Sequence, residues 1–157
     1  MVDYYQRWEK VGKYFGTYIR NLDSKNRLLL PSKLMGEMPS RLYLLRGFEG
    51  AISLYSEDSF QKFLSKLESL SYFDSNARSF TRLAASSVVP LDVDGHDRIT
   101  LPMEIKNRYG IEQEVVIIGA LDHIEVFNKK AYEEYLAKEE ARFEEIADVL
   151  SKTGEKE

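Results

Sequence analysis

The residues best suited to chemistry lie in a ten-residue motif that occurs twice in the sequence. Residues 22–31 read LDSKNRLLLP and residues 93–102 read VDGHDRITLP, so Asp, Arg, Leu and Pro recur at matching places, 71 positions apart. Arginine donates a pair of hydrogen bonds to guanine, asparagine pairs with adenine in the same way, and lysine neutralises phosphate. The motif therefore offers the residue types of a nucleic-acid contact, which are Lys25, Asn26, Arg27 and Arg98.

The same motif also has a purely structural interpretation. An Asp before a turn accepts hydrogen bonds from backbone N–H groups two residues further on, and we assign Asp23 and Asp94 mainly to that role. Arg27 and Arg98 would then pair with these carboxylates, which stabilises an exposed turn by about 0–1 kcal/mol. A single loop leaves both interpretations open. The recurrence of a turn in such detail favours a function.

Catalytic and metal-binding chemistry find little support in the residue types. The chain has no Cys, which excludes thiolate zinc sites and a cysteine nucleophile, and its two histidines, His96 and His123, form no metal-spaced pair. The sequence contains no glycine-rich phosphate loop and no nucleophile elbow. Carboxylates near the C-terminus mostly fall away from the apolar stripe of one helix, as on a solvated face. We expect no catalytic residue, no metal and no cofactor, and an enzyme is the weakest hypothesis.

Composition and charge are those of a globular protein that is not broadly basic. The 157 residues are 43% apolar and 31% charged, with a net charge of −4. The charge is graded, because residues 1–50 carry nine Lys/Arg and five Asp/Glu, whereas residues 112–157 carry six and thirteen. An acidic chain does not coat nucleic acid by bulk charge, although a compact basic face near the N-terminus is compatible with the total. No secretory leader and no apolar run of membrane-spanning length is present, so we expect a cytoplasmic protein without a membrane partner.

Hydropathy and turn signals predict the element order β-β-α-β-β-α, which occurs twice in the chain, with an extra helix that links the two copies. The runs rich in β-branched and aromatic residues predict short strands at 14–20, 27–30, 41–46, 51–55, 88–93, 98–101, 114–118 and 123–127. Tight turns are expected at 47–50 and 119–122. Pro31 and Pro102 are placed at first helical positions, and Gly110 at the end of the second short helix.

Apolar spacing predicts three longer helices. The first follows Ser56 as its N-cap, the second spans residues 74–85, and the third follows Asn128 as its N-cap and continues to about residue 150. Residues 151–157 lack apolar side chains and are expected to fray.

Three stretches together resemble the MraZ family. They are Gly16 with the segment LDSKNRL and Pro31, the segment VDGHDRI with Pro102, and EVVIIGALDHIEVF at residues 114–127. The resemblance covers about residues 14–150. It implies a mainly β fold with helices (α+β), in which two swapped-hairpin AbrB-like modules interleave into one pseudo-dimeric barrel with flanking helices.

The resemblance also divides the chain into segments. These are an N-terminal extension (1–13), a first AbrB-like (SpoVT-AbrB) module (17–59), a helical linker (60–86), a second module (87–130), and a C-terminal helix with a frayed tail (131–157).

Function is implied by the same resemblance. MraZ proteins are bacterial transcription regulators that bind direct repeats upstream of the division and cell-wall gene cluster containing their own gene, and they assemble into rings. The expected partners are thus double-stranded promoter DNA and further copies of the chain, in the cytoplasm and associated with the nucleoid. Carried over by position, the DNA-binding residues are Lys25, Asn26, Arg27, His96 and Arg98, with Asp23 and Asp94 structuring the loops.

The chain departs from the family pattern in its loops. Family loops tend to have Gly before the Arg, where this chain has Asn26 and Asp97. Asn and Asp tolerate left-handed backbone best among the other residues, so the turn can form. Asp97 adds a negative charge beside Arg98, and we expect the first loop to dominate binding. The alternative function is an oligomeric scaffold whose Arg loops bind an acidic protein partner.

Overall fold

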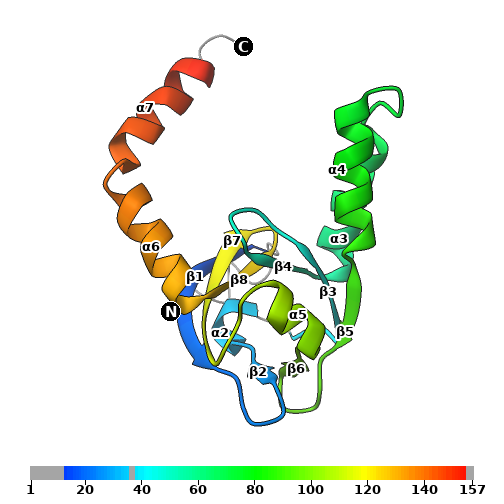
Figure 1. Ribbon diagram of the computed structural model, residues 1–157, viewed down its shortest axis with the longest axis vertical. Coiled ribbons are helices and arrows are strands. Elements are labelled where there is room, and N and C mark those ends of the chain that lie inside the picture. Colours follow the sequence, from blue (N-terminus) through cyan, green and yellow to red (C-terminus); the bar gives the residue numbers. More distant parts are fainter. Residues whose placement is uncertain (1–12, 36–37, 155–157) are drawn as a thin grey trace, which may run out of the picture.

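The computed structural model describes residues 13–35 and 38–154, and it has mixed α and β structure (Figure 1). The strands are β1 (Tyr14–Asn21), β2 (Arg27–Leu29), β3 (Arg41–Arg46), β4 (Ile52–Tyr55), β5 (Val89–Asp92), β6 (Arg98–Thr100), β7 (Glu114–Leu121) and β8 (Ile124–Asn128). The helices are α2 (Ser32–Met35), α3 (Glu57–Glu68), α4 (Ser75–Ser86), α5 (Met103–Arg108), α6 (Lys129–Glu140) and α7 (Phe143–Gly154). The predicted element order is confirmed.

The two copies of the repeat exchange strands. A six-stranded antiparallel sheet has the order β1-β7-β8-β4-β3-β5, and β2 pairs with β6 in a separate two-stranded ribbon. Strand β1 of the first copy thus pairs with β7 of the second, while β5 of the second pairs with β3 of the first. Equivalent strands meet in the pairs β4–β8 and β2–β6. The interleaving implied by the family resemblance is confirmed.

One hydrophobic core fills the space between the sheet and the β2–β6 ribbon. Alternate residues of the strands point into it, and Leu28, Leu44, Ile99, Ile117 and Ile124 are fully buried. Burying such a side chain stabilises the fold by roughly 1.5–3 kcal/mol relative to leaving it exposed. Both copies therefore contribute to this core, while a smaller cluster of Leu45, Tyr55 and Phe60 lies within the first copy.

Two helical arms project from one end of the barrel, and the loops before β2 and β6 lie at the other end (Figure 1). The linker arm consists of α3 and α4, which begin at N-caps formed by Ser56 and Asp74. The C-terminal arm consists of α6 and α7, and Asn128 caps α6. In the part of the chain that the structure describes, no helix is long and apolar enough to cross a membrane.

Backbone geometry explains the presence of glycine at two positions, 119 and 110. Gly119 pairs with Gly16 in the antiparallel β1–β7 pair, and a Cβ atom at Gly119 would lie 2.2 Å from the backbone nitrogen of Phe15. Gly110 has φ +63°, the left-handed conformation expected just after α5.

Several predicted boundaries are wrong. Pro102 is the N-cap of α5 and not its first residue, and α2 begins one residue after Pro31. The second tight turn lies at residues 122–123, because β7 continues to Leu121. The single C-terminal helix is two helices, interrupted at residues 141–142, and Ser151 to Gly154 are helical where fraying was expected. Most of the N-terminal extension (1–13) and residues 155–157 lie outside the described residues.

Candidate nucleic-acid interface

The two Asp-x-x-x-Arg loops lie side by side at the end of the barrel away from the arms (Figure 1). We define loop 1 as residues 23–27 and loop 2 as residues 94–98. Each loop precedes one strand of the β2–β6 ribbon, in which Leu28 pairs with Ile99. The backbone N–H of Leu30 donates to the carbonyl of Asp97 and that of Leu101 to the carbonyl of Asn26, both at 2.9 Å. Two segments far apart in sequence thus form one surface.

In loop 1, the carboxylate of Asp23 organises the whole turn. One oxygen, Oδ1, accepts hydrogen bonds from the backbone N–H groups of Lys25 and Arg27, each at 2.9 Å. The other, Oδ2, accepts a hydrogen bond from Nε of Arg27 at 2.6 Å. The Arg27 guanidinium is therefore held in a fixed orientation by the residue that shapes its loop.

Loop 2 repeats this arrangement in the same detail. Oδ1 of Asp94 accepts hydrogen bonds from the backbone N–H groups of His96 at 2.8 Å and of Arg98 at 3.0 Å, and Oδ2 accepts from Nε of Arg98 at 2.9 Å. Both the capping and the Arg–Asp pair considered from the sequence are thus present. Of the three nitrogens in each guanidinium, only Nε takes part in the Arg–Asp pair.

The residue before each Arg has left-handed backbone, with φ of 60° at Asn26 and 61° at Asp97. This is the conformation that glycine adopts at least strain and that Asn and Asp tolerate best among other residues. The expectation that the turn survives the replacement of glycine is therefore confirmed.

The hydrogen bonds within the loops lower the pKa of both carboxyls. Arg27 lowers the pKa of Asp23, first through its backbone N–H and then through its side chain. Burial acts to raise the pKa of Asp94, but the backbone N–H groups of His96 and Arg98 together with the Arg98 side chain outweigh it and lower the pKa. Both residues thus favour the charged state that orients the arginines.

One contact at this surface has no signal in the local sequence. Nζ of Lys106, on α5, donates a hydrogen bond of 2.6 Å to Oδ1 of Asn26, 80 positions earlier in the chain. The contact occupies the amide oxygen of Asn26 and adds a positive charge beside loop 1. Sequence analysis missed Lys106 because only the pairing of β2 with β6 brings α5 to the first loop.

The remaining groups of the two loops face solvent. The side chains of Lys25 and His96 are exposed and have no side-chain partner within the described ranges. The Arg27 and Arg98 side chains are 29% and 27% exposed, and their terminal nitrogens have no partner among the described residues. Such oriented guanidinium groups can donate to a guanine edge, a phosphate or a carboxylate. The described residues contain no group of three His, Cys, Asp or Glu able to hold a metal ion.

Comparison with known families assigns both copies of the repeat to one family. The family model described as "MraZ protein, putative antitoxin-like" matches residues 14–83 and again residues 86–152. The chain belongs to the MraZ family. The two matched segments correspond to the two interleaved copies, and the MraZ match begins where β1 begins.

Curated MraZ proteins resemble the chain over most of its length. "Transcriptional regulator MraZ" of Mesoplasma florum is 35% identical over 138 residues, which cover 87% of this chain and 94% of the relative. The MraZ regulator of Lactobacillus delbrueckii subsp. bulgaricus is 36% identical over 137 residues, covering 87% and 96%. That of Thermoanaerobacter pseudethanolicus is 32% identical over 135 residues, covering 86% and 94%.

Proposed function

We propose that this protein is a transcriptional regulator that binds DNA sequence-specifically through loops 1 and 2, at direct repeats in the promoter of its own division and cell-wall gene cluster. The observation that carries the proposal is the pair of oriented guanidinium groups on one surface, each with its terminal nitrogens free of protein partners in the described part of the chain. The names of the MraZ relatives support regulation of transcription as the role of this surface.

The loop residues have different roles in this proposal. Arg27 and Arg98 contact base edges, because a bidentate guanidinium discriminates guanine from other bases. Lys25 contacts phosphate, and His96 occupies the equivalent position of loop 2. Asn26 contributes mainly through its NH₂ group, since Lys106 occupies its carbonyl oxygen. Asp23 and Asp94 orient the arginines without touching DNA.

The distribution of charge in the fold supports the proposal despite the net charge of −4. Residues 112–157 carry thirteen acidic and six basic residues. Many of the acidic residues lie on α6 and α7, which project from the end of the barrel opposite to the loops (Figure 1). Repulsion between this arm and DNA phosphates is therefore weakened by distance and screened by salt beyond roughly 8–10 Å.

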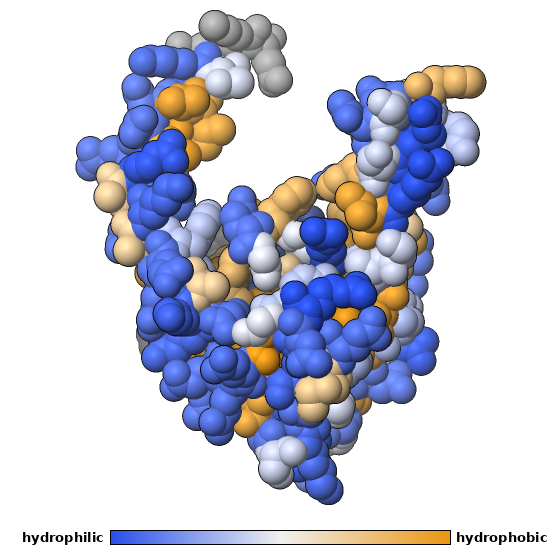
Figure 2. All heavy atoms as spheres, in the orientation of Figure 1, coloured by the Kyte–Doolittle hydropathy of each residue, from blue (hydrophilic) through white to orange (hydrophobic). Residues whose placement is uncertain are grey.

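Self-association through the arms is the second part of the proposal. Both arms expose large apolar side chains, among which Phe73 is 94% and Phe143 is 73% exposed. Figure 2 shows apolar surface on the side of the C-terminal arm that faces the linker arm. Contact between the linker arm of one copy and the C-terminal arm of the next is head-to-tail, and such contacts form a ring when the rotation between copies closes. A ring presents several loop surfaces to successive repeats, which raises the overall affinity.

The test is DNA binding measured by fluorescence anisotropy, with the region upstream of the protein's own gene and a scrambled sequence at two salt concentrations. We expect wild type to prefer the upstream DNA and the Arg27→Ala/Arg98→Ala variant to lose that preference. Arg142→Ala, in the C-terminal arm, is the matched control and should keep it. Equal, weak binding of wild type to both DNAs would contradict the proposal and favour the scaffold, whose acidic protein partner would then require Arg27.

Sedimentation velocity tests the self-association separately. Wild type is expected to sediment as an oligomer and Phe143→Glu as smaller species, since the variant places a charge on the exposed apolar stripe of α7. A monomeric wild type at all concentrations would exclude the ring.

A further inference from the structure

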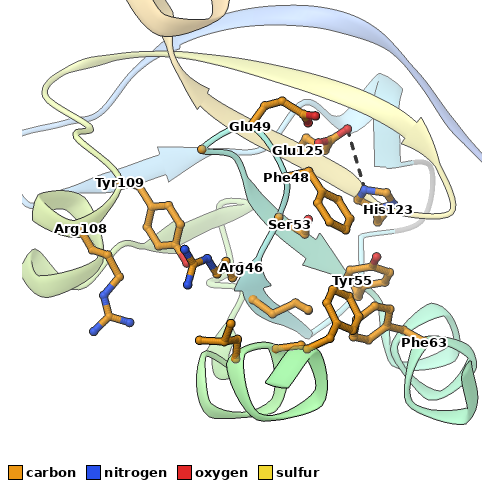
Figure 3. Close-up of a pocket in the computed structure, with 16 residues that line it drawn as sticks. Arg46, Phe48, Glu49, Ser53, Tyr55, Phe63, Arg108, Tyr109, His123 and Glu125 are labelled. Carbon is orange, nitrogen blue, oxygen red and sulfur yellow. Dashed lines mark ion pairs between the residues drawn. The ribbon is translucent and has the colours of Figure 1, made fainter. Parts of the chain in front are cut away.

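A hollow of about 830 Å³ lies between the sheet and the linker arm, and no part of the DNA-binding proposal uses it. Its walls come from strands β3, β4 and β8, the turn between β3 and β4, helices α3 and α4, and the end of α5, so both copies of the repeat and the linker contribute. Its volume falls in the range of roughly 300–1,000 Å³ that is typical of small-molecule sites. Figure 3 shows the side chains that line it.

Four polar residues form one side of this hollow. Ser53 on β4 is the direct cross-strand partner of Glu125 on β8, so their side chains project from the same face of the sheet. Tyr55 follows two residues after Ser53 on β4, and His123 lies in the turn just before β8, and their rings stack at 4.8 Å between centroids. Strands β4 and β8 are neighbours in the middle of the sheet, and Figure 3 shows all four side chains on one side of the hollow.

Two hydroxyl groups on this wall have no hydrogen-bond partner within the described residues. Ser53 and Tyr55 are only 5% and 7% exposed, yet neither hydroxyl is bonded to a protein group. Neither oxygen is sealed away from solvent, since no fully buried side-chain oxygen lacks a partner in the described part of the chain. Both hydroxyls therefore open onto the hollow, where they can accept hydrogen bonds from a ligand.

The same end of the hollow is acidic and aromatic. Glu49 and Glu125 lie close together there (Figure 3). Burial raises the pKa of Glu125 and the charge of Glu49 raises it further, while His123, whose Nε2 lies 3.9 Å from Oε1 of Glu125, acts to lower it. The exposed ring of Phe48 stacks on Phe80 of the linker arm at 6.3 Å. The cations Arg46 and Arg108 lie at the opposite end, beside Tyr109 (Figure 3). The acidic end thus offers acceptors and aromatic rings to a positive charge.

We infer that this hollow is a binding site for an organic cation, whose ammonium or guanidinium group donates hydrogen bonds to Glu125, Ser53 and Tyr55 while its apolar body packs against Phe48 and Phe80. A cation relieves the repulsion between Glu49 and Glu125, which an anion or an uncharged ligand does not, and its N–H groups also satisfy both hydroxyls. Aromatic rings beside the charge add to the attraction. Because Phe80 belongs to the linker arm, an occupied site also ties that arm to the sheet.

Isothermal titration calorimetry with two nearly isosteric probes tests the inference without DNA. The probes are 2-phenylethylamine, which is a cation, and 2-phenylethanol, which is neutral. We expect the amine to bind wild type at least tenfold more tightly than the alcohol. Glu125→Gln should remove that preference, and Glu133→Gln, a carboxylate on α6 that pairs with Lys129 outside the hollow, should retain it.

A second variant covers the case in which Glu125→Gln disturbs the sheet. Tyr55→Phe keeps the stacked ring and removes one acceptor, so it should weaken amine binding severalfold and leave alcohol binding unchanged. Equal affinity for amine and alcohol, equal losses in Glu125→Gln and Glu133→Gln, or no binding of the amine would each overturn the inference.

Protein concentration separates two sources of the cation. Amine affinity that is the same in dilute and concentrated protein indicates a free amine as the ligand. Affinity that falls as copies associate indicates that a Lys or Arg side chain of a second copy occupies the site. Both results require the cation site at Glu125.

Discussion

Loops 1 and 2 share one backbone design and differ in charge. In each loop an Asp accepts two backbone hydrogen bonds and one from the Arg Nε, and the residue before the Arg has φ near 60°. Loop 1 contains Lys25 and Asn26, whose equivalents in loop 2 are His96 and Asp97, and Lys106 adds a further positive charge beside loop 1. Both copies of the repeat therefore keep the Asp hydrogen bonds that orient an arginine. The charges around each loop decide how strongly that loop attracts DNA.

The largest expected difference between the loops concerns their arginines. Arg27→Ala should reduce affinity for the specific DNA by about 1–3 kcal/mol and relax discrimination at one base pair, because it removes a bidentate contact. Arg98→Ala should cost less, because Asp97 beside it already weakens the attraction to DNA. Anisotropy titrations of both single variants measure the difference. A larger loss for Arg98→Ala would reverse the ranking of the loops.

Exchanging the residues before the arginines sharpens the comparison. Asp97→Asn should strengthen DNA binding and Asn26→Asp should weaken it, by about 1 kcal/mol each, since each change adds or removes one unit charge near phosphates. Both residues tolerate the left-handed backbone, so the turns should be retained. Circular dichroism checks the fold of each variant. If both substitutions changed affinity in the same direction, charge would not be the cause of the asymmetry.

Salt dependence distinguishes phosphate contacts from base contacts. Lys25→Ala should lower the slope of log K against log salt concentration by about 0.9, and His96→Lys should raise it by a similar amount, because one phosphate contact is lost or gained. Affinity for specific and scrambled DNA should change alike in both variants. A selective effect on the specific DNA would instead assign these residues to base recognition.

The smallest expected effect is on stability in acid. The pKa of Asp23 is lower in the folded protein than in the unfolded chain. The contribution of Asp23 to folding stability is therefore fully present above the unfolded pKa and is lost as the pH falls through the folded pKa. Asp23→Asn should therefore lower the urea midpoint at pH 7, and its difference from wild type should shrink as the pH falls towards 3. Asp94→Asn should show the same trend, because the folded pKa of Asp94 is lowered too. A difference that grows towards acid pH would contradict the assigned role of both carboxylates.

The features that the sequence predicts are those set by short-range chemistry. Turn residues, alternating hydropathy and the 71-residue repeat suffice for the element order, and the preference of Asn and Asp for left-handed backbone predicts the conformation of Asn26 and Asp97. The interleaving of the copies came from the family resemblance, since no local pattern determines which copy supplies the partner of β1.

The features that the sequence does not predict depend on long-range register and on helix breaks. Lys106 reaches Asn26 across 80 residues, and Ser53 faces Glu125 only because β4 pairs with β8 in one register. The break between α6 and α7 lies at Ala141 and Arg142, where no glycine or proline marks it. These contacts follow from how the elements pack, which neighbouring residues do not encode.

NMR of the arginine side chains tests the central claim most directly. Upstream DNA and scrambled DNA are added in turn to protein labelled at the guanidinium nitrogens, and the signals of Arg27 and Arg98 are followed. The account predicts that both signals shift with the upstream DNA, that of Arg27 more, and that scrambled DNA leaves them nearly unchanged. Unchanged loop signals, with shifts confined to arginines of the arms such as Arg78 or Arg142, would contradict it.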